Sequence, residues 1–177
     1  MVYMFVAPGF EEMEVIAPIN ILRRAKIDIT TVGIGQKTIK GAHGIPLVTD
    51  IIDTEFKISD ITMVILPGGK IGVENLKAST VVNDAIDYCA SNDIFIAAIC
   101  AAPVILAEKG LFKGKHVTAY PKTLDGLTDA TLSDKQVVRD GNIITGKSAG
   151  AAPEFAFELV KILTTTKEAD QVKEDMQ

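Results

Sequence analysis

Short apolar segments alternate with amphipathic segments along the chain, and this alternation predicts an α/β fold. Continuous apolar runs bounded by Gly, Pro or charged residues are typical of buried strands, whereas apolar positions three and four residues apart indicate helices. Strands that alternate with helices usually form a mostly parallel sheet with helices on both faces. We expect strands at residues 2–6, 27–34, 63–66, 94–99, 116–120 and 136–145, a loop or hairpin at 35–50, and helices at 11–25, 80–92, 104–108, 153–163 and 167–177.

Several residues of chemical interest directly follow predicted strands. Pro8 and Gly9 end the first strand, the Pro-Gly-Gly segment 67–69 ends the third, and Cys100 and Tyr120 end two later ones. The carboxyl ends of parallel strands meet at one edge of a sheet, where α/β proteins place their ligand sites. We therefore expect these segments to converge on a single site.

Cys100 lies at the junction between the strand at 94–99 and a helix that begins near Pro103. Alanines on both sides of Cys100 allow a tight turn, and Pro103 suits the first turn of a helix, where a missing N–H is no loss. A thiol at a helix N-terminus has a lowered pKa and becomes a nucleophilic thiolate, on the same principle as the elbow serine of α/β hydrolases. The alternative is a buried structural cysteine.

Length and composition favour one soluble globular domain, residues 1–177. Apolar residues make up 47% of the chain and charged residues 23%, which is ordinary for such a domain. The formal net charge of −5 argues against binding to the phosphate backbone of nucleic acids. No apolar run is long enough for a membrane span, and the first residues lack a secretory signal. With two cysteines and no disulfide framework, the chain is expected in the cytoplasm.

Five segments of the sequence resemble one protein family. They are GFEEMEVIAPINILRRA, MVILPGG followed by IGVENL, AAICAAP, HVTAYP and PEFAFELV, in this order. Together they are similar to the ThiJ/PfpI superfamily and, within it, to the branch of the Parkinson-disease deglycase/chaperone protein (DJ-one) and its bacterial relatives. The resemblance covers residues 3–175. It implies a flavodoxin-like three-layer sandwich with a mostly parallel central sheet, like that of class I glutamine amidotransferases, and a homodimer.

The resemblance also implies a function. It indicates a cofactor-free, cysteine-dependent enzyme of the glyoxalase or deglycase type, a hydro-lyase or hydrolase. Such an enzyme acts on small α-oxoaldehydes such as methylglyoxal, or on their protein adducts, and protects against carbonyl and oxidative stress. The alternative is a redox-sensing stress protein or chaperone in which Cys100 is oxidised without turnover. A flavin carrier has less support, because no hydroxyl-rich phosphate loop follows the first strand.

Glu14 is the second candidate catalytic residue beside Cys100. It shares a helical stripe with Ala17 and Ile21, which normally face protein, so its carboxyl must be paired or protonated. By resemblance, Glu14 corresponds to the glutamate that hydrogen-bonds the nucleophilic sulfur and acts as acid and base. Glu11 and Glu12 are interpreted as complements to the positive end of the helix dipole.

Backbone N–H groups are expected to complete the site. The resemblance implies that the N–H groups of Gly69 and Ala101 form an oxyanion-type pocket beside Cys100. The alternative for the Gly-Gly pair is an ordinary turn. A phosphate-binding loop is not supported, because no helix start with a matching glycine spacing follows.

Neither histidine occupies the position where many superfamily members have one. Tyr120 stands at that position and is expected in the pocket, and His116 lies about 13 Å away along an extended strand at roughly 3.3 Å per residue. A Cys–His pair of the protease kind is therefore not expected. The loop with His43 resembles a family segment that crosses the dimer interface, so His43 is a candidate for completing the partner's site in trans. Otherwise His43 is a solvated loop histidine.

Cys89 provides an internal comparison for Cys100. It follows Val82, Ala85 and Ile86 at helical spacing, so it is expected to be buried and unreactive. No cluster of Cys and His has zinc-site spacing, so a catalytic metal is not implied.

Two arginines end the first predicted helix. Arg23 and Arg24 resemble a family pair that meets carboxylates at the dimer interface. They are equally well interpreted as ordinary cations at a helix C-terminus, where they complement the dipole.

Overall fold

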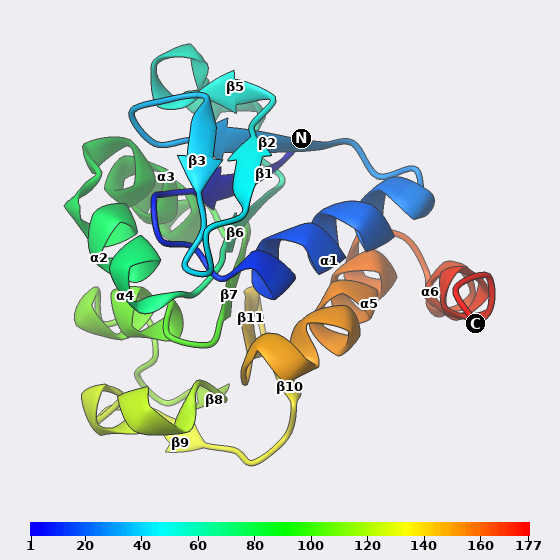
Figure 1. Cartoon of the computed structure of the whole chain (residues 1–177). Helices are drawn as coiled ribbons and strands as arrows, with labels where there is room; N and C mark the ends of the chain where they lie inside the picture. The colour runs from blue at the N-terminus through cyan, green and yellow to red at the C-terminus, as the bar shows by residue number, and fades with distance from the viewer.

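The computed structural model describes residues 1–177, and a seven-stranded sheet forms its centre (Figure 1). Its strand order is β10-β11-β7-β6-β1-β2-β5, and all neighbours are parallel except β10 and β11. This confirms the predicted α/β fold with a mostly parallel sheet. The strands are β1 (Val2–Val6), β2 (Ile29–Gly33), β5 (Ile51–Ile52), β6 (Met63–Leu66), β7 (Phe95–Ile99), β10 (Val137–Asp140) and β11 (Ile143–Gly146).

Helices cover both faces of this sheet and give the molecule three layers (Figure 1). Alternate side chains of a strand point to opposite faces, so Met4 and Val6 pack with α1, α5 and α6, whereas Tyr3 and Phe5 pack with α2, α3 and α4. None of these helices combines the length and the apolar character needed to span a bilayer. The helices are α1 (Glu12–Arg24), α2 (Lys70–Ala78), α3 (Thr80–Ser91), α4 (Pro103–Glu108), α5 (Ala152–Leu163) and α6 (Thr166–Glu174).

Helix α2 is absent from the sequence prediction. Its buried residues are Gly72, Val73 and Leu76, so its apolar stripe is short and includes a glycine. Glycine weakens a helical pattern, and tertiary packing overrides that weakness here. Gly72 is needed in this helix, because a Cβ at its position would lie 2.9 Å from the Cα of Phe10.

Two predicted strands differ from the structure. Of the predicted strand 116–120, only β8 (His116–Val117) forms a strand. It pairs with β9 (Thr131–Leu132) in a separate two-stranded sheet. The segment 136–145 is a hairpin of β10 and β11 rather than one strand. Gly141, with a φ of 65°, makes the turn between them.

The remaining elements are short. Strands β3 (Thr38–Lys40) and β4 (Pro46–Val48) pair antiparallel, as the predicted loop or hairpin at 35–50 allows. The short 3₁₀ helices are η1 (Asp53–Glu55), η2 (Ile58–Asp60), η3 (Pro121–Gly126) and η4 (Ala149–Ala151).

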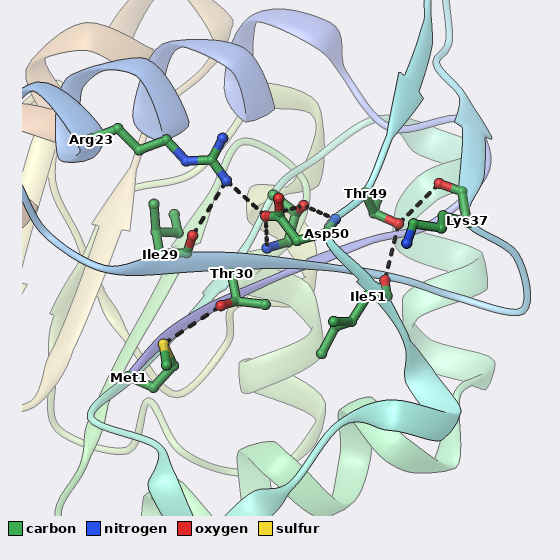
Figure 2. Close-up of polar contacts among 9 residues, drawn as sticks. Met1, Arg23, Ile29, Thr30, Lys37, Thr49, Asp50 and Ile51 are labelled. Carbon is green, nitrogen blue, oxygen red and sulfur yellow. Dashed lines mark hydrogen bonds and ion pairs between the residues drawn. The ribbon is translucent and has the colours of Figure 1, made fainter.

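Asp50 fastens the end of the β3–β4 hairpin to α1 and β2 (Figure 2). Its Oδ2 accepts hydrogen bonds from the Thr31 N–H at 2.9 Å and the Thr31 hydroxyl at 2.8 Å, and it lies 2.7 Å from Arg23 Nη2. Burial raises the pKa of Asp50, but the hydrogen bonds from Thr31 and the charge of Arg23 outweigh burial, so the pKa is lowered overall. The carboxylate therefore stays charged and holds the hairpin against the helix.

Arg23 and Arg24 make their contacts within the chain. Arg23 Nη2 donates to the Ile29 carbonyl at 3.4 Å as well as to Asp50 (Figure 2), and Arg24 Nε donates to Asn20 Oδ1 at 2.8 Å. These contacts agree with the interpretation of both residues as cations at the end of a helix. Pairing across a dimer stays a prediction.

Candidate active site

Cys100 occupies a sharp turn between β7 and α4. Its backbone has a φ of 65°, in the left-handed region that few residues other than glycine adopt. The Cys100 N–H donates to the Gly146 carbonyl at 2.9 Å, and the Cys100 carbonyl accepts from the Tyr120 N–H at 2.8 Å. Such conformations cost free energy, persist only where the surrounding structure fixes them, and cluster at functional sites. The structure thus has the strand-to-helix elbow that the sequence predicts.

Glu14 lies in the first turn of α1, and its side chain is fully buried next to Cys100. Its Oε2 accepts a hydrogen bond from the Gly68 N–H at 2.8 Å, whereas its Oε1 has no N–H or O–H donor within reach. Burial is the largest cause of a raised pKa at Glu14, and the charge of Glu11 raises it further. Hydrogen bonds from the Cys100 thiol and the Gly68 N–H lower it, and the resulting pKa is about 7. This carboxyl therefore gains and loses a proton near neutral pH, as an acid/base catalyst must.

Gly68 allows Glu14 and Cys100 to approach each other. A Cβ at its position would lie 2.5 Å from Glu14 Oε2 and 2.8 Å from the Cys100 Cβ. Any larger residue would push the two functional groups apart. Sequence reasoning assigned a role to Gly69 but not to Gly68, and no local signal distinguishes the two glycines.

The environment of Cys100 raises the pKa of its thiol. Burial is the largest cause, the charge of Glu14 and the contact with its carboxyl raise the pKa further, and the N–H groups of Ala101 and Gly69 lower it. The prediction of a lowered pKa is therefore wrong, because it considered the helix N-terminus and neglected desolvation and the neighbouring carboxylate. The thiol therefore keeps its proton at neutral pH, and the carboxyl beside it is the group that can accept that proton.

A cavity of about 650 Å³ opens over Cys100, a volume typical of small-molecule sites. The predicted residues Cys100, Glu14, Gly69, Ala101 and Tyr120 all line it, so the structure brings them together. The same walls carry polar residues that sequence reasoning missed. They are Glu11, Lys70, Glu74, Lys77, Lys122, Thr123 and Ser148.

Comparison with known proteins identifies the family. The model of the DJ-1/PfpI family matches residues 1–162. The chain belongs to the DJ-1/PfpI family. It is similar to protein dj-1beta of Drosophila melanogaster, with 36% identity over 169 residues that cover 94% of this chain and 90% of the relative. It is also similar to the Parkinson disease protein 7 homolog of Danio rerio, with 33% identity over 172 residues that cover 94% of this chain and 91% of the relative.

A solved structure supports the same assignment. The crystal structure of Drosophila melanogaster DJ-1beta matches this DJ-1/PfpI chain with a TM-score of 0.94 and 34% identity, over 99% of this chain and 96% of that one. The resemblance inferred from the five sequence segments is confirmed, both for the family and for the DJ-1 branch.

His43 lies outside the cavity of its own chain in this DJ-1/PfpI fold. Its Nδ1 is 2.8 Å from Glu12 Oε2 and 3.6 Å from Glu11 Oε2, and 69% of its side chain is exposed. The hydrogen bond with Glu12 raises the pKa of His43. The role of His43 in the partner's site stays a prediction.

Glu12 has a second role besides the predicted one. It is buried, and its Oε1 accepts hydrogen bonds from the N–H groups of His43 at 2.7 Å and Ile45 at 3.4 Å. Burial raises the pKa of Glu12, but the bonds from His43 and the backbone outweigh it and lower the pKa. Glu12 therefore fixes the hairpin tip to α1, in addition to complementing the helix dipole. Ligand atoms of Glu11, Glu12 and His43 lie within 4.8 Å of one another, close enough to hold a metal ion, but both Glu12 oxygens are already engaged by the hairpin.

Cys89 and His116 are separate from the site. Cys89 is fully buried on α3, and burial raises the pKa of its thiol to about 12, as expected of an unreactive cysteine. The His116 side chain is 66% exposed beside Asp140 and does not line the cavity. This agrees with the prediction that His116 does not replace the missing histidine.

Proposed function

We propose that this chain is a cysteine-dependent enzyme of the glyoxalase or deglycase type, acting on small α-oxoaldehydes such as methylglyoxal or on their protein adducts. The observation that carries the proposal is the buried Glu14 carboxyl, with a pKa of about 7, next to the Cys100 thiol at the base of a cavity. A thiol and a carboxyl that ionise together supply both a nucleophile and an acid/base group.

The first step is attack of sulfur on the aldehyde carbon. At neutral pH a large fraction of Glu14 is ionised, and its carboxylate accepts the Cys100 proton as the C–S bond forms. Glu14 then gives this proton to the aldehyde oxygen, beside which the N–H groups of Gly69 and Ala101 stabilise the developing charge, so that Glu14 is again ionised. The product is a hemithioacetal.

The second step moves a hydrogen between the two substrate carbons. Glu14 removes the proton from the former aldehyde carbon and the ketone oxygen gains a proton, which gives an ene-diol. The hydroxyl on the sulfur-bearing carbon then loses a proton as Glu14 returns its own proton to the neighbouring carbon. The carbonyl group is then at the carbon bound to sulfur, as a thioester. Water hydrolyses the thioester, which releases a 2-hydroxy acid and the free thiol. The overall reaction adds one water to the oxoaldehyde and needs neither an oxidant nor a cofactor.

A homodimer is part of the proposal. Met13 and Ile16 on α1 and Ile45 and Val48 on the hairpin are apolar, yet between 46% and 66% of each is exposed. The hairpin tip is bound to the start of α1, since the Ala42 N–H donates to the Phe10 carbonyl at 2.8 Å, so the two elements form one face (Figure 1). A second copy of the chain would cover this face and would bring its His43 near the cavity. We also infer a cytoplasmic location, where two free cysteines persist.

A redox-sensing or chaperone role is the second candidate. Cys100 is partly exposed while Cys89 is buried, so an oxidant reaches Cys100 first. The Glu14 carboxyl beside it could hydrogen-bond an oxidised sulfur. In this alternative the oxidised protein, rather than turnover, protects the cell against oxidative stress.

Formation of lactate from methylglyoxal tests the proposed enzyme. We expect Cys100→Ser to reduce lactate formation by at least ~100-fold, because the hydroxyl is a much weaker nucleophile than a thiolate. Cys89→Ser is the matched control and should keep most of the activity, since Cys89 lies outside the cavity. Equal rates in the wild type and Cys100→Ser would exclude the proposed chemistry, and an inactive wild type whose Cys100 oxidises selectively would favour the sensor.

A further inference from the structure

The buried carboxyl of Glu14 has a free oxygen next to Cys100. The Glu14 side chain is fully buried, its Oε2 accepts the Gly68 N–H at 2.8 Å, and its Oε1 has no N–H or O–H donor. The other donor in contact with this carboxyl is the Cys100 thiol. A buried carboxylate oxygen without a donor costs free energy. Whenever the sulfur carries no hydrogen, a water molecule is therefore a favoured partner for Oε1.

An acyl group on Cys100 creates this situation. Acylation replaces the thiol hydrogen, so Glu14 loses the thiol as a donor while it still lines the cavity. A water molecule that donates to Oε1 is then held beside the acyl carbon, and the carboxylate accepts its proton as it attacks. The N–H groups of Gly69 and Ala101 contact the sulfur, so they lie next to the acyl oxygen that becomes negatively charged. The site therefore suits hydrolysis of an acyl-cysteine, whatever the origin of the acyl group.

The available proton donor favours thioesters over amides as sources of this acyl group. In an acyl transfer, Glu14 takes the proton of Cys100 and must then return it to the leaving group. An ordinary thiol has a pKa of ~8.5, so a carboxyl with a pKa of about 7 readily protonates the departing thiolate. An amine leaves only after its nitrogen is protonated, which is the task of histidine in proteases. No histidine lines this cavity, so amides are not expected to react.

We infer that the Cys100–Glu14 pair also hydrolyses external thioesters of short 2-hydroxy acids. The Cys100 sulfur attacks the thioester carbonyl as Glu14 takes its proton, the bond to the external sulfur breaks, and the external thiol leaves with the proton from Glu14. Water then attacks the acyl-enzyme as Glu14 takes a proton from it, the bond to the Cys100 sulfur breaks, and that sulfur regains the proton. The reaction consumes one water and involves no oxidation or reduction. It rests on the proposed function for the hydrolysis step alone and adds a second class of substrate.

The cavity has room for both parts of such a thioester. Its volume is about 650 Å³, and pockets of roughly 300–1,000 Å³ enclose ligands of drug size, whereas a lactoyl group is small. Glutamates and lysines are balanced on its walls, so a charge on the external thiol is not favoured. They are Glu11, Glu14, Glu74, Lys70, Lys77 and Lys122. Uncharged thiols such as N-acetylcysteamine and 2-mercaptoethanol are therefore suitable carriers.

Release of lactate from the lactoyl thioester of N-acetylcysteamine tests the inference. We expect Cys100→Ala and Glu14→Gln each to lower kcat/KM by at least ~100-fold, because one removes the nucleophile and the other the acid/base group. Cys89→Ser is the matched control and should keep the wild-type rate, since Cys89 lies outside the cavity. Lactamide has the same acyl group on an amine and should not be hydrolysed. Equal rates for the thioester in the wild type and Cys100→Ala, or comparable turnover of lactamide, would overturn the inference.

Hydroxylamine tests whether the thioesters share one acyl-enzyme. It competes with water for the acyl group and yields lactohydroxamate in place of lactate. The ratio of lactohydroxamate to lactate should be the same for the lactoyl thioesters of N-acetylcysteamine and 2-mercaptoethanol, because the external thiol has left before the two nucleophiles compete. A ratio that differs between the two thioesters would contradict an acyl-enzyme on Cys100.

Methylglyoxal, measured alongside, separates this inference from the proposed function. Lactate formation from methylglyoxal without hydrolysis of either thioester would overturn the inference and leave the proposed function intact. Hydrolysis of both thioesters without lactate from methylglyoxal would support the inference and reject the proposed transfer of hydrogen between the substrate carbons.

Discussion

At the scale of single residues, the site is organised around one proton that Glu14 and Cys100 exchange. Removing both groups from water disfavours charge on either, so burial raises both pKa values. The N–H groups of Gly69 and Ala101 partly offset this at the sulfur, and the N–H of Gly68 does so at the carboxyl. Near neutral pH the thiol therefore keeps its proton while the carboxyl is partly ionised, which is the distribution of protons that the proposed reaction needs.

Replacing Glu14 by Gln should remove a pH dependence of stability. The folded-state pKa of Glu14 is about 7, so between its ordinary value and pH 7 the folded protein binds one proton more than the unfolded chain. The stabilisation is complete below about pH 4 and is lost as the pH rises through 7. Urea unfolding should show that the wild-type free energy of unfolding falls by about 2–3 kcal/mol more than that of Glu14→Gln between pH 5 and pH 8.

The control for this measurement is Glu154→Gln, a change at an exposed glutamate of α5. Its stability should follow the wild type across the same pH range. If Glu14→Gln and the wild type lose stability in parallel, the carboxyl is ionised at low pH and the raised pKa is wrong.

At the scale of elements, two polar clusters join the β3–β4 hairpin to the rest of the fold. Glu12 binds its tip through His43 and Ile45, and Asp50 binds its end through Thr31 and Arg23. Neither cluster is part of the apolar core, but both determine where the hairpin lies relative to α1. The geometry of the proposed dimer face therefore depends on these hydrogen bonds as well as on Ile39 of β3, which is fully buried in the core.

Thr31→Val should weaken the attachment of the hairpin. The Thr31 hydroxyl accepts the Asp50 N–H at 2.8 Å and donates to Asp50 Oδ2 at 2.8 Å, and valine keeps the shape while removing both bonds. A part-buried N–H without a partner costs about 1–3 kcal/mol, which should appear in the free energy of unfolding. The matched control is Thr30→Val on the same strand, because the Thr30 hydroxyl meets only the Met1 sulfur at 3.5 Å (Figure 2). Equal losses in the two variants would show that β-propensity or packing, not the bond to Asp50, is responsible.

The sequence predicts those elements whose apolar pattern is local and strong. Every residue of Val2–Val6 is apolar and buried, and α5 has a complete apolar stripe, so both were predictable. Helix α2 was not, because its Gly72 is required by the nearby Phe10 and not by the helix itself. Cys100 and Glu14 could be found from a strand–helix junction and a helical stripe. The raised pKa of the Cys100 thiol could not, because it arises from burial and from the close approach of Glu14 that Gly68 permits.

At the scale of the whole molecule, the exposed apolar face of α1 and the hairpin is the feature that one chain leaves unexplained. The face continues into a shallow depression lined by Ile16, Leu47 and Val48 together with Arg23 and Asp50. Large exposed apolar side chains grouped on one surface indicate an interface. Since His43 lies at the hairpin tip beside this face, dimerisation and its proposed role in the partner's site are linked.

Complementation between two inactive variants tests this link. If His43 assists proton transfer in trans, His43→Ala should lower turnover of methylglyoxal by at least ~10-fold, a small general acid–base contribution. The contact with Glu12 raises the pKa of His43, so the imidazolium persists to a higher pH than in a free histidine. The activity that depends on the imidazolium should therefore decline as the pH rises through that pKa.

Mixed heterodimers of Cys100→Ser and His43→Ala should regain activity, because one of their two sites has an intact Cys100 and receives an intact His43. His116→Ala is the control, since His116 does not line the cavity and should have no effect. A monomer in analytical ultracentrifugation, or full activity in His43→Ala, would show that Glu14 and water carry the protons alone.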